Sequence, residues 1–330
     1  MSLLSKKKIA RSLVYLPIFF LTLSSFSVFV NPASFPISAL FYSSFPIWLV
    51  LSLLAALFLC RYKKSLLIYA CGLLINGLSI YNFCPVNIQE TPNDYQLKIV
   101  SYNVHNFRKD KDLDTTYLKQ FVPVFNDFQA DLIFYQEGGQ GSLLKDALAT
   151  NYPYQLNTMT EKSSNLGVYS KYPILNYEII VITRNNATAI FNIQLPTGDT
   201  LSVLNCHLVS YNFEDNHFSL TKFLNASRLR GEQVDSICKY LDKHDTSNMI
   251  VLGDFNETPI SYSHHKFSSR LKDCFVSSGM GFGATFNKFF SPLRIDHIFC
   301  GEGWASLTCC VNKDYELSDH FPIVATLRKN

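Results

Sequence analysis

The chain has 330 residues, of which 48% are hydrophobic and 17% are charged. Its net charge of +3 is unevenly distributed: all 26 acidic residues follow Phe83, whereas seven of the 29 Lys and Arg residues precede Cys84. From Cys84 onward, 22 cations face 26 acids, a net charge of −4. This balance argues against a dedicated duplex-DNA enzyme, which usually presents a basic face to phosphates. The nine cysteines lack metal-ligand spacing, which excludes zinc fingers.

The N-terminal quarter contains three long apolar runs, Ile9–Val30, Ile37–Cys60 and Ser65–Phe83. Each is close to the roughly 20 residues that cross a bilayer. We therefore expect residues 1–83 to be a membrane anchor with about three transmembrane helices. A cleaved signal peptide explains only the first run, and a buried pair of soluble helices would leave a surface without carboxylates. Two or four spans stay open as alternatives, because serines interrupt the first two runs.

The positions of the cations predict the orientation of this anchor. Lys6–Arg11 and Arg61–Lys64 are expected on the cytoplasmic side, whereas the turn at Asn31–Pro36 carries no Lys or Arg. An odd number of spans then places the C-terminal part outside the cytoplasm. The chain is thus expected in the cytoplasmic membrane, with a cytoplasmic N-terminus and an extracytoplasmic (in Gram-negative cells, periplasmic) domain.

Residues 84–96 are expected to form a polar linker to a domain spanning residues 97–330. Hydrophobic periodicity predicts helices over Asp112–Gln129 and Ser227–Lys243. Residues 166–174, 177–184 and 188–196 are expected to be successive antiparallel strands, followed by a hairpin turn at Pro196–Asp199. Many strands with few helices indicate two facing sheets with helices outside.

Six short polar signatures each end an apolar, strand-like run. They contain Asn103, Glu137, His207, Asp254 with Asn256, Asp296, and Asp319 with His320. Strands that end at one edge of a sheet bring such side chains together. Carboxylate and amide oxygens beside imidazoles suit a hard divalent cation next to a water-activating group. The pattern predicts an enzyme.

The ordered set of signatures resembles the endonuclease/exonuclease/phosphatase superfamily, over residues 97–327. The resemblance implies an α/β fold, namely a four-layer α/β/β/α sandwich of two mostly antiparallel sheets. It also implies metal-dependent attack of water on a phosphoester, with Mg²⁺ as cofactor and Mn²⁺ as the alternative. No Ser or Cys nucleophile is required, and no obligate protein partner is indicated.

The resemblance also implies a role for each signature residue. Glu137 would be the principal metal ligand, assisted by Asn103 and Asp319. Asp254 would orient or deprotonate the attacking water, and Asn256 would hold the water or the phosphoryl oxygens. The competing interpretations are a surface carboxylate before a turn for Glu137, a self-capping Asn103, and a non-catalytic turn at Asp254–Asn256.

The histidines are expected to act on the phosphate. Asp296 would hold His320 and support its charged form, and His207 would be a second donor that stabilises transition-state charge. A satisfied core histidine is the alternative for His207. Three further histidines are not expected to take part in catalysis. His297 is expected to be structural, and His264 and His265 are expected to be solvated in a Ser-rich loop.

The substrate is less well defined than the chemistry. Val104–Phe107 replaces the Gly-containing stretch of abasic-site endonucleases, and Tyr102-Asn103 replaces the Trp-Asn of 5-phosphatases. The anchored, outward-facing layout is similar to that of members acting on polyprenyl-phosphate lipids, which favours a membrane-lipid phosphate or pyrophosphate. An extracytoplasmic endonuclease or exonuclease acting on nucleic acid is the alternative, and a non-catalytic binding module is a remote one.

Overall fold

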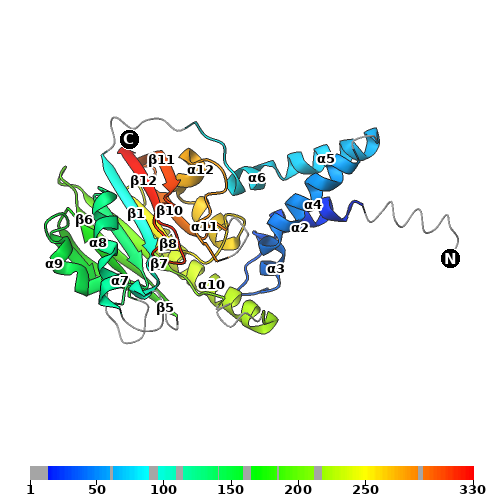
Figure 1. The fold of residues 1–330 in the computed structure, drawn as a ribbon. Coiled ribbons are helices and arrows are strands. Elements are labelled where there is room, and N and C mark those ends of the chain that lie inside the picture. Colours follow the sequence, from blue (N-terminus) through cyan, green and yellow to red (C-terminus); the bar gives the residue numbers. More distant parts are fainter. Residues whose placement is uncertain are drawn as a thin grey trace.

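The computed structural model describes residues 14–59, 62–88, 96–108, 114–139, 141–158, 165–183, 186–211, 218–288 and 293–330. Figure 1 shows two parts: a projecting set of helices from residues 14–83, here called the arm, and an α/β body formed by residues 96–330. Among the cations expected on the cytoplasmic side, Lys6–Arg11 and Arg61 lie outside the described residues.

The body contains two six-stranded mixed sheets. The first has the order β11 (Trp304–Val311), β12 (Ile323–Lys329), β1 (Leu97–Asn103), β2 (Leu132–Gln136), β4 (Gly167–Ser170), β3 (Tyr154–Asn157). The second has the order β5 (Ile174–Thr183), β6 (Asn186–Gln194), β7 (Thr200–His207), β8 (Met249–Asp254), β10 (Asp296–Cys300), β9 (Lys272–Asp273). Alternate side chains of both sheets, such as Phe134 and Phe191, meet in a buried core between them.

Helices cover the outer faces of the two sheets (Figure 1). The first sheet carries α7 (Thr115–Lys119), α8 (Phe121–Asp127) and α9 (Lys145–Leu148), with 3₁₀ turns η1 (His105–Phe107) and η2 (Gly141–Leu144). The second carries α10 (Leu220–Leu241) and α11 (Tyr262–Ser268), and α12 (Cys274–Ser278) packs beside β11. Separate apolar clusters join each helical layer to its sheet. The predicted α/β sandwich of two facing, mostly antiparallel sheets is thus present: β1–β2 and β7–β8 are the parallel pairs, and the other pairs of both sheets are antiparallel.

Three local predictions need correction. The helix expected over Asp112–Gln129 is divided at Gln120 into α7 and α8, because Pro123 has no N–H to bond the carbonyl of residue 119. The helix expected from Ser227 instead begins at Leu220, with Ser219 as its N-cap. The three strands expected to be successive do not share one sheet: β4 pairs with β2 and β3 in the first sheet, whereas β5 pairs with β6 in the second. The hairpin at Pro196–Asp199 is confirmed, with Gly198 at a φ of 88°.

The arm consists of short helices: α2 (Leu16–Ser27), α3 (Ser38–Ser43), α4 (Phe45–Phe58), α5 (Lys63–Ile75) and α6 (Gly77–Phe83). Among the described residues, no single helix has both the length and the apolarity for a span; α5 and α6 reach both together but bend by 61°. Over the described residues, the three runs expected to be spans therefore form the shorter helices α2 to α6. Pro17 and Pro46 occupy first turns of helices, where the missing N–H costs nothing, so helices start there instead of running through.

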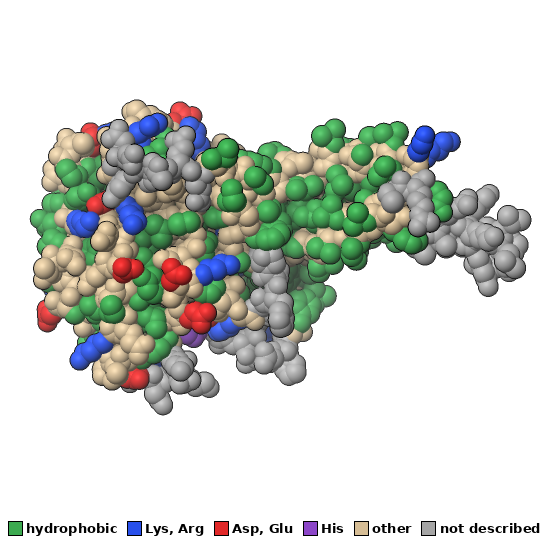
Figure 2. All heavy atoms as spheres, turned by 45° about the horizontal axis from the view of Figure 1, so that its top comes forward, with side chains coloured by type: hydrophobic (Ala, Val, Ile, Leu, Met, Phe, Trp, Pro, Cys, Tyr) green, Lys and Arg blue, Asp and Glu red, His purple; other side chains and the backbone are tan. Residues whose placement is uncertain are grey.

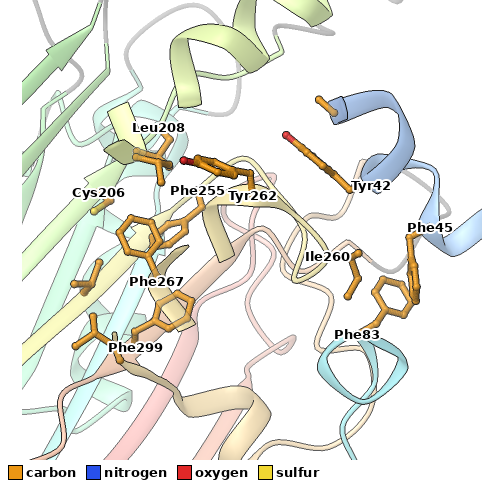
Figure 3. Packing of buried hydrophobic residues seen from close by; sticks show 14 of the residues in the cluster. Tyr42, Phe45, Phe83, Cys206, Leu208, Phe255, Ile260, Tyr262, Phe267 and Phe299 are labelled. Atoms are coloured by element: carbon orange, nitrogen blue, oxygen red, sulfur yellow. The ribbon is translucent and has the colours of Figure 1, made fainter. Parts of the chain in front are cut away.

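The arm packs directly on the body. Asn31 Nδ2 donates to Asp235 Oδ2 of α10 at 2.7 Å, and the ring of Phe83 contacts both Phe45 and Phe282. Figure 3 shows Tyr42, Phe45 and Phe83 facing the body residues Ile260 and Tyr262 within one apolar cluster. Beyond α6, Val86 forms a β-bridge with Met280. The expected linker thus begins with residues that rest on the body.

Candidate active site

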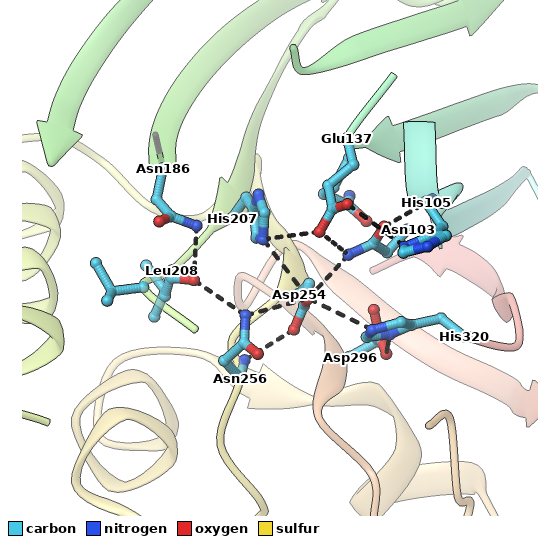
Figure 4. Close-up of polar contacts among 12 residues, drawn as sticks. Asn103, His105, Glu137, Asn186, His207, Leu208, Asp254, Asn256, Asp296 and His320 are labelled. Atoms are coloured by element: carbon cyan, nitrogen blue, oxygen red, sulfur yellow. Dashed lines mark hydrogen bonds and ion pairs between the residues drawn. The ribbon is translucent and has the colours of Figure 1, made fainter. Parts of the chain in front are cut away.

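Strand register brings the predicted site residues to one edge of the sandwich. In the second sheet, His207 and Asp254 are paired at the ends of parallel strands β7 and β8, and Asp296 pairs with Asp254 from the antiparallel β10. In the first sheet, Asn103 ends β1 beside the end of β2, which Glu137 follows. Figure 4 shows these side chains converging from both sheets on Asp254.

Asn103 connects the two sheets at this edge. Its Nδ2 donates to Glu137 Oε1 at 3.1 Å and to Asp254 Oδ2 at 3.0 Å. Its own carbonyl accepts the Ser318 hydroxyl at 2.7 Å, which fixes the segment carrying Asp319 and His320. The side chain is buried, so this amide is a structural tie as well as a potential oxygen donor to a metal.

Asp254 is held by the residue that follows two positions later. The Asn256 backbone N–H donates to Asp254 Oδ1 at 2.8 Å, and its Nδ2 lies 3.2 Å from Asp254 Oδ2. His207 Nε2 lies 3.8 Å from Asp254 Oδ2 and 3.5 Å from Glu137 Oε1. Burial raises the pKa of Asp254, and His320 and His207 oppose this effect. A carboxylate with a raised pKa is a better proton acceptor.

His320 forms a buried pair with Asp296. Its Nδ1 lies 2.7 Å from Asp296 Oδ2, and its Nε2 lies 3.7 Å from Asp254 Oδ2. Burial lowers the pKa of His320, but Asp296 and Asp254 outweigh burial and raise it to about 10. The imidazole is therefore held as a cation at neutral pH, with Nε2 directed toward Asp254.

Asp319 completes the cluster together with two residues that sequence reasoning did not assign. His105 Nδ1 lies 3.4 Å from Asp319 Oδ1 and 3.9 Å from Glu137 Oε2, and Lys288 Nζ lies 2.7 Å from Asp319 Oδ2. Burial raises the pKa of Asp319, but His320 and Lys288 bring it below its usual value. His105 could have been found from the sequence, because it follows Asn103 by two residues in the signature IVSYNVH. No sequence pattern pointed to Lys288.

The donor set fits a hard divalent cation. One donor atom each from Glu137, His207 and Asp254 lies within 4.8 Å of the others, and Asn103 and Asp319 add oxygens nearby. Carboxylate and amide oxygens are the ligands that Mg²⁺ and Mn²⁺ prefer. Such an ion would relieve the mutual repulsion of the Glu137, Asp254 and Asp319 carboxylates at this edge.

A cavity of about 570 Å³ opens over this cluster. Its polar floor includes Glu137, Asp254 and Asp319. Its walls are the body residues Tyr211, Phe223, Phe286, Leu293 and Ile295, together with Tyr42 and Ser43 of the arm. The acidic floor of the cavity is thus continuous with an apolar wall to which the arm contributes.

The structure brings all eight predicted site residues together and corrects one other prediction. His264 is not solvated: it is buried in α11, with Nε2 2.7 Å from Asp273 Oδ2. Burial lowers the pKa of His264, and Asp273 opposes this shift. His297 Nε2 lies 2.9 Å from the Glu257 carbonyl, as expected for a structural residue on the face opposite to Asp296.

Two mixed sheets with outer helices, and a cluster of carboxylates, Asn and His at their strand ends, define a class of metal-dependent phosphoester hydrolases. The chain belongs to this class: it is a member of the endonuclease/exonuclease/phosphatase family, whose model matches residues 100–320. No curated protein matches the chain in sequence.

Solved structures share the fold at low sequence identity. An endonuclease/exonuclease/phosphatase from Beutenbergia cavernae is 17% identical with a TM-score of 0.59, over 72% of each chain. A mannosyl-6-phosphatase from Bacteroides thetaiotaomicron is 18% identical (TM-score 0.52, 70% of this chain and 99% of that one). A Neisseria 3′ phosphatase bound to a product DNA hairpin is 16% identical (TM-score 0.53, 69% and 98%). These similarities establish the fold and leave the substrate open.

Proposed function

We propose that this chain is a membrane-anchored hydrolase of a lipid phosphate or pyrophosphate, acting outside the cytoplasm. The observation that carries the proposal is the shared wall of the active-site cavity. Tyr42 and Ser43 of the arm line the same cavity as Glu137 and Asp254. A substrate whose phosphate meets the acidic cluster would therefore place its remaining part beside the arm and the apolar wall.

The chemistry follows from the side chains. Glu137, Asn103 and Asp319 would hold Mg²⁺ or Mn²⁺, which when bound polarises the phosphoryl oxygens. Asp254 would orient the attacking water and accept its proton, and Asn256 would hold the water in line. His320, kept cationic by Asp296, and His207 would donate to the phosphoryl oxygens as negative charge builds up.

The surface of the arm supports insertion in a membrane. Figure 2 shows apolar side chains along the arm and mixed polar and apolar ones on the body. Many large apolar residues of the arm are more than half exposed, among them Phe19, Phe29, Leu57, Phe58 and Leu74. Exposed apolar surface on this scale is typical of contact with a membrane or a partner.

The two ends of the arm differ in a way that supports the proposed orientation. Lys63 and Lys64 begin α5, at the end of the arm far from the body (Figures 1 and 2). The turn after Asn31 lies at the other end, against α10. With the cations on the cytoplasmic side, the turn and the body share the opposite side.

Nucleic acid is the second candidate substrate. The Neisseria structure with bound DNA favours it, whereas the net charge of −4 from Cys84 onward, 22 cations against 26 acids, disfavours it. A lipid phosphate requires no extended basic face, because its single headgroup contacts the metal cluster alone.

The full-length protein reconstituted in vesicles tests the proposal. Phosphate release from a vesicle-borne polyprenyl pyrophosphate and nicking of a plasmid would be measured in parallel with Mg²⁺ and with Mn²⁺. Asp254→Asn provides the blank, and Asp245→Asn on the surface provides the matched control. Lipid turnover that only Asp254→Asn abolishes is the expected result. Nicking without lipid turnover, lost in the same variant, would replace the proposal with a surface nuclease.

A further inference from the structure

A buried hydrogen bond connects the arm to the loop that carries Asn256. The Tyr42 hydroxyl donates to Glu257 Oε1 at 2.7 Å, and Tyr42 is 1% exposed. Glu257 directly follows Asn256 and is itself buried. An arm residue therefore contacts the residue directly after Asn256.

Glu257 is one half of a buried ion pair. Arg230 Nε of α10 lies 3.0 Å from Glu257 Oε1, and Arg230 has no exposed surface. The Ser263 hydroxyl donates to the other carboxylate oxygen, and the Tyr211 ring stacks under the guanidinium at 4.0 Å. A buried carboxylate is costly unless it is paired and its oxygens accept hydrogen bonds, so the Tyr42 hydroxyl supplies part of what keeps Glu257 in place.

Arg230 in turn holds the two backbone segments that present the catalytic groups. Its Nη1 donates to the carbonyl of Val209 at 2.5 Å and to that of Asn256 at 3.1 Å. Val209 lies two residues after His207, and Asn256 lies two residues after Asp254. The guanidinium thus fixes the extensions of both β7 and β8 relative to each other.

The segment it fixes is conformationally demanding. Asn256 has a φ of 51°, which non-glycine residues adopt at a cost and retain only when surrounding contacts impose it. In this conformation Asn256 bonds both oxygens of Asp254 and the Leu208 carbonyl. A small displacement of Glu257 would therefore reach Asp254 through the adjacent residue.

We infer that Tyr42 is a positioning residue for catalysis: through Glu257 and Arg230, the arm sets the geometry of Asn256 and Asp254. This makes the N-terminal arm a component of the active site as well as an anchor. The inference depends on the phosphoesterase active site and not on a lipid being the substrate.

Tyr42→Phe in the full-length protein tests this inference, since it removes only the hydroxyl. Hydrolysis of bis(p-nitrophenyl) phosphate and amide hydrogen exchange of the peptides covering residues 207–209 and 254–258 are the two readouts. We expect kcat to fall about tenfold with KM nearly unchanged, and exchange to rise in both peptides. Tyr69→Phe is the matched control, because the Tyr69 hydroxyl bonds Val14 within the arm; it should change neither readout.

A double-mutant cycle separates positioning from general destabilisation. Glu257→Asp keeps the charge that Arg230 requires but shortens the side chain that Tyr42 reaches. If Tyr42 acts through Glu257, adding Tyr42→Phe to Glu257→Asp causes little further loss of kcat. Unchanged exchange in both peptides after Tyr42→Phe, or fully additive losses in the cycle, would overturn the inference. The exchange readout decides the question even if the small diester is turned over slowly, and it is independent of lipid hydrolysis.

Discussion

His320 Nδ1 lies 2.7 Å from Asp296 Oδ2, and both side chains are buried at the edge where the two sheets meet. The two residues come from separate segments, β10 and the turn that precedes β12. The second Asp296 oxygen has no hydrogen-bond partner among the described residues. Asp296 therefore holds the imidazole through a single oxygen, and its charge, together with that of Asp254, raises the pKa of His320 and favours the protonated form.

Asp296→Asn should move the alkaline limb of the activity profile. In the native protein the pKa of His320 is raised to about 10, so a reaction that needs the imidazolium stays active until the pH approaches that value. Removing the carboxylate lowers the pKa, and kcat/KM should then decline at a lower pH. Rates measured between about pH 6 and about pH 11 check this. An alkaline limb that stays in place would show that His320 does not act as the cation; Asp245→Asn serves as the surface control.

The same pair should make stability depend on pH. The pKa of His320 in the folded state exceeds the value of about 6.5 expected in the unfolded state. Its contribution to the free energy of unfolding is therefore fully present below about pH 6.5. This contribution is lost as the pH rises through the folded value of about 10. Urea unfolding should therefore show a declining free energy of unfolding between these limits, and the decline should be smaller in Asp296→Asn. Equal slopes in both proteins would contradict the assigned pair.

Divalent metal should stabilise the protein through Glu137. Binding to the folded state alone adds about 2.7 kcal/mol at a hundredfold excess over Kd, which thermal unfolding with Mg²⁺ or Mn²⁺ and after chelation would reveal as a shift in Tm. Glu137→Gln should weaken metal binding at least about tenfold and reduce that shift. Glu302→Gln, at an exposed position, should leave it unchanged. An equal Tm shift in both variants would remove Glu137 from the metal ligands.

Gly253→Ala should be strongly destabilising. Gly253 has a φ of 129°, and a Cβ there would lie 1.9 Å from the Cys206 carbonyl oxygen, so strand β8 would have to move away from β7. We expect a loss of about 3 kcal/mol or more in urea unfolding. Gly198 has a φ of 88° but open space around it, so Gly198→Ala should lower the free energy of unfolding by only about 1 kcal/mol. Similar losses in both would mean that backbone conformation, and not close packing, requires Gly253.

The sequence predicted the catalytic cluster well because each signature ends a strand. Parallel pairing fixes His207 beside Asp254 once the strands are recognised, and the apolar runs indicate those strands directly. The failures have the opposite character. His264 stands among polar residues, and only the packing of α11 on Asp273 buries it. Local polarity says little about burial when a helix is short.

Local sequence patterns could not predict that the arm contacts the active-site loop. Tyr42 lies in an apolar run whose composition predicts a membrane span, and its partner Glu257 is remote in sequence. The interruption of the runs was partly readable, since Pro46 marks the start of α4, but tolerance of proline inside membrane helices favoured continuous spans. Contacts between distant segments depend on tertiary packing, which periodicity alone does not encode.

The pairing of β1 with β12 has a consequence for biosynthesis. Leu97 of the first body strand is bonded opposite Leu327 of the last described strand, so β1 has an open edge until nearly the whole body has been synthesised. An unpaired apolar edge strand invites association with other chains. For a nascent protein of this design, holdase chaperones that cover β1 would be expected to govern yield, and overproduction without them should lead to aggregation before the metal site has formed.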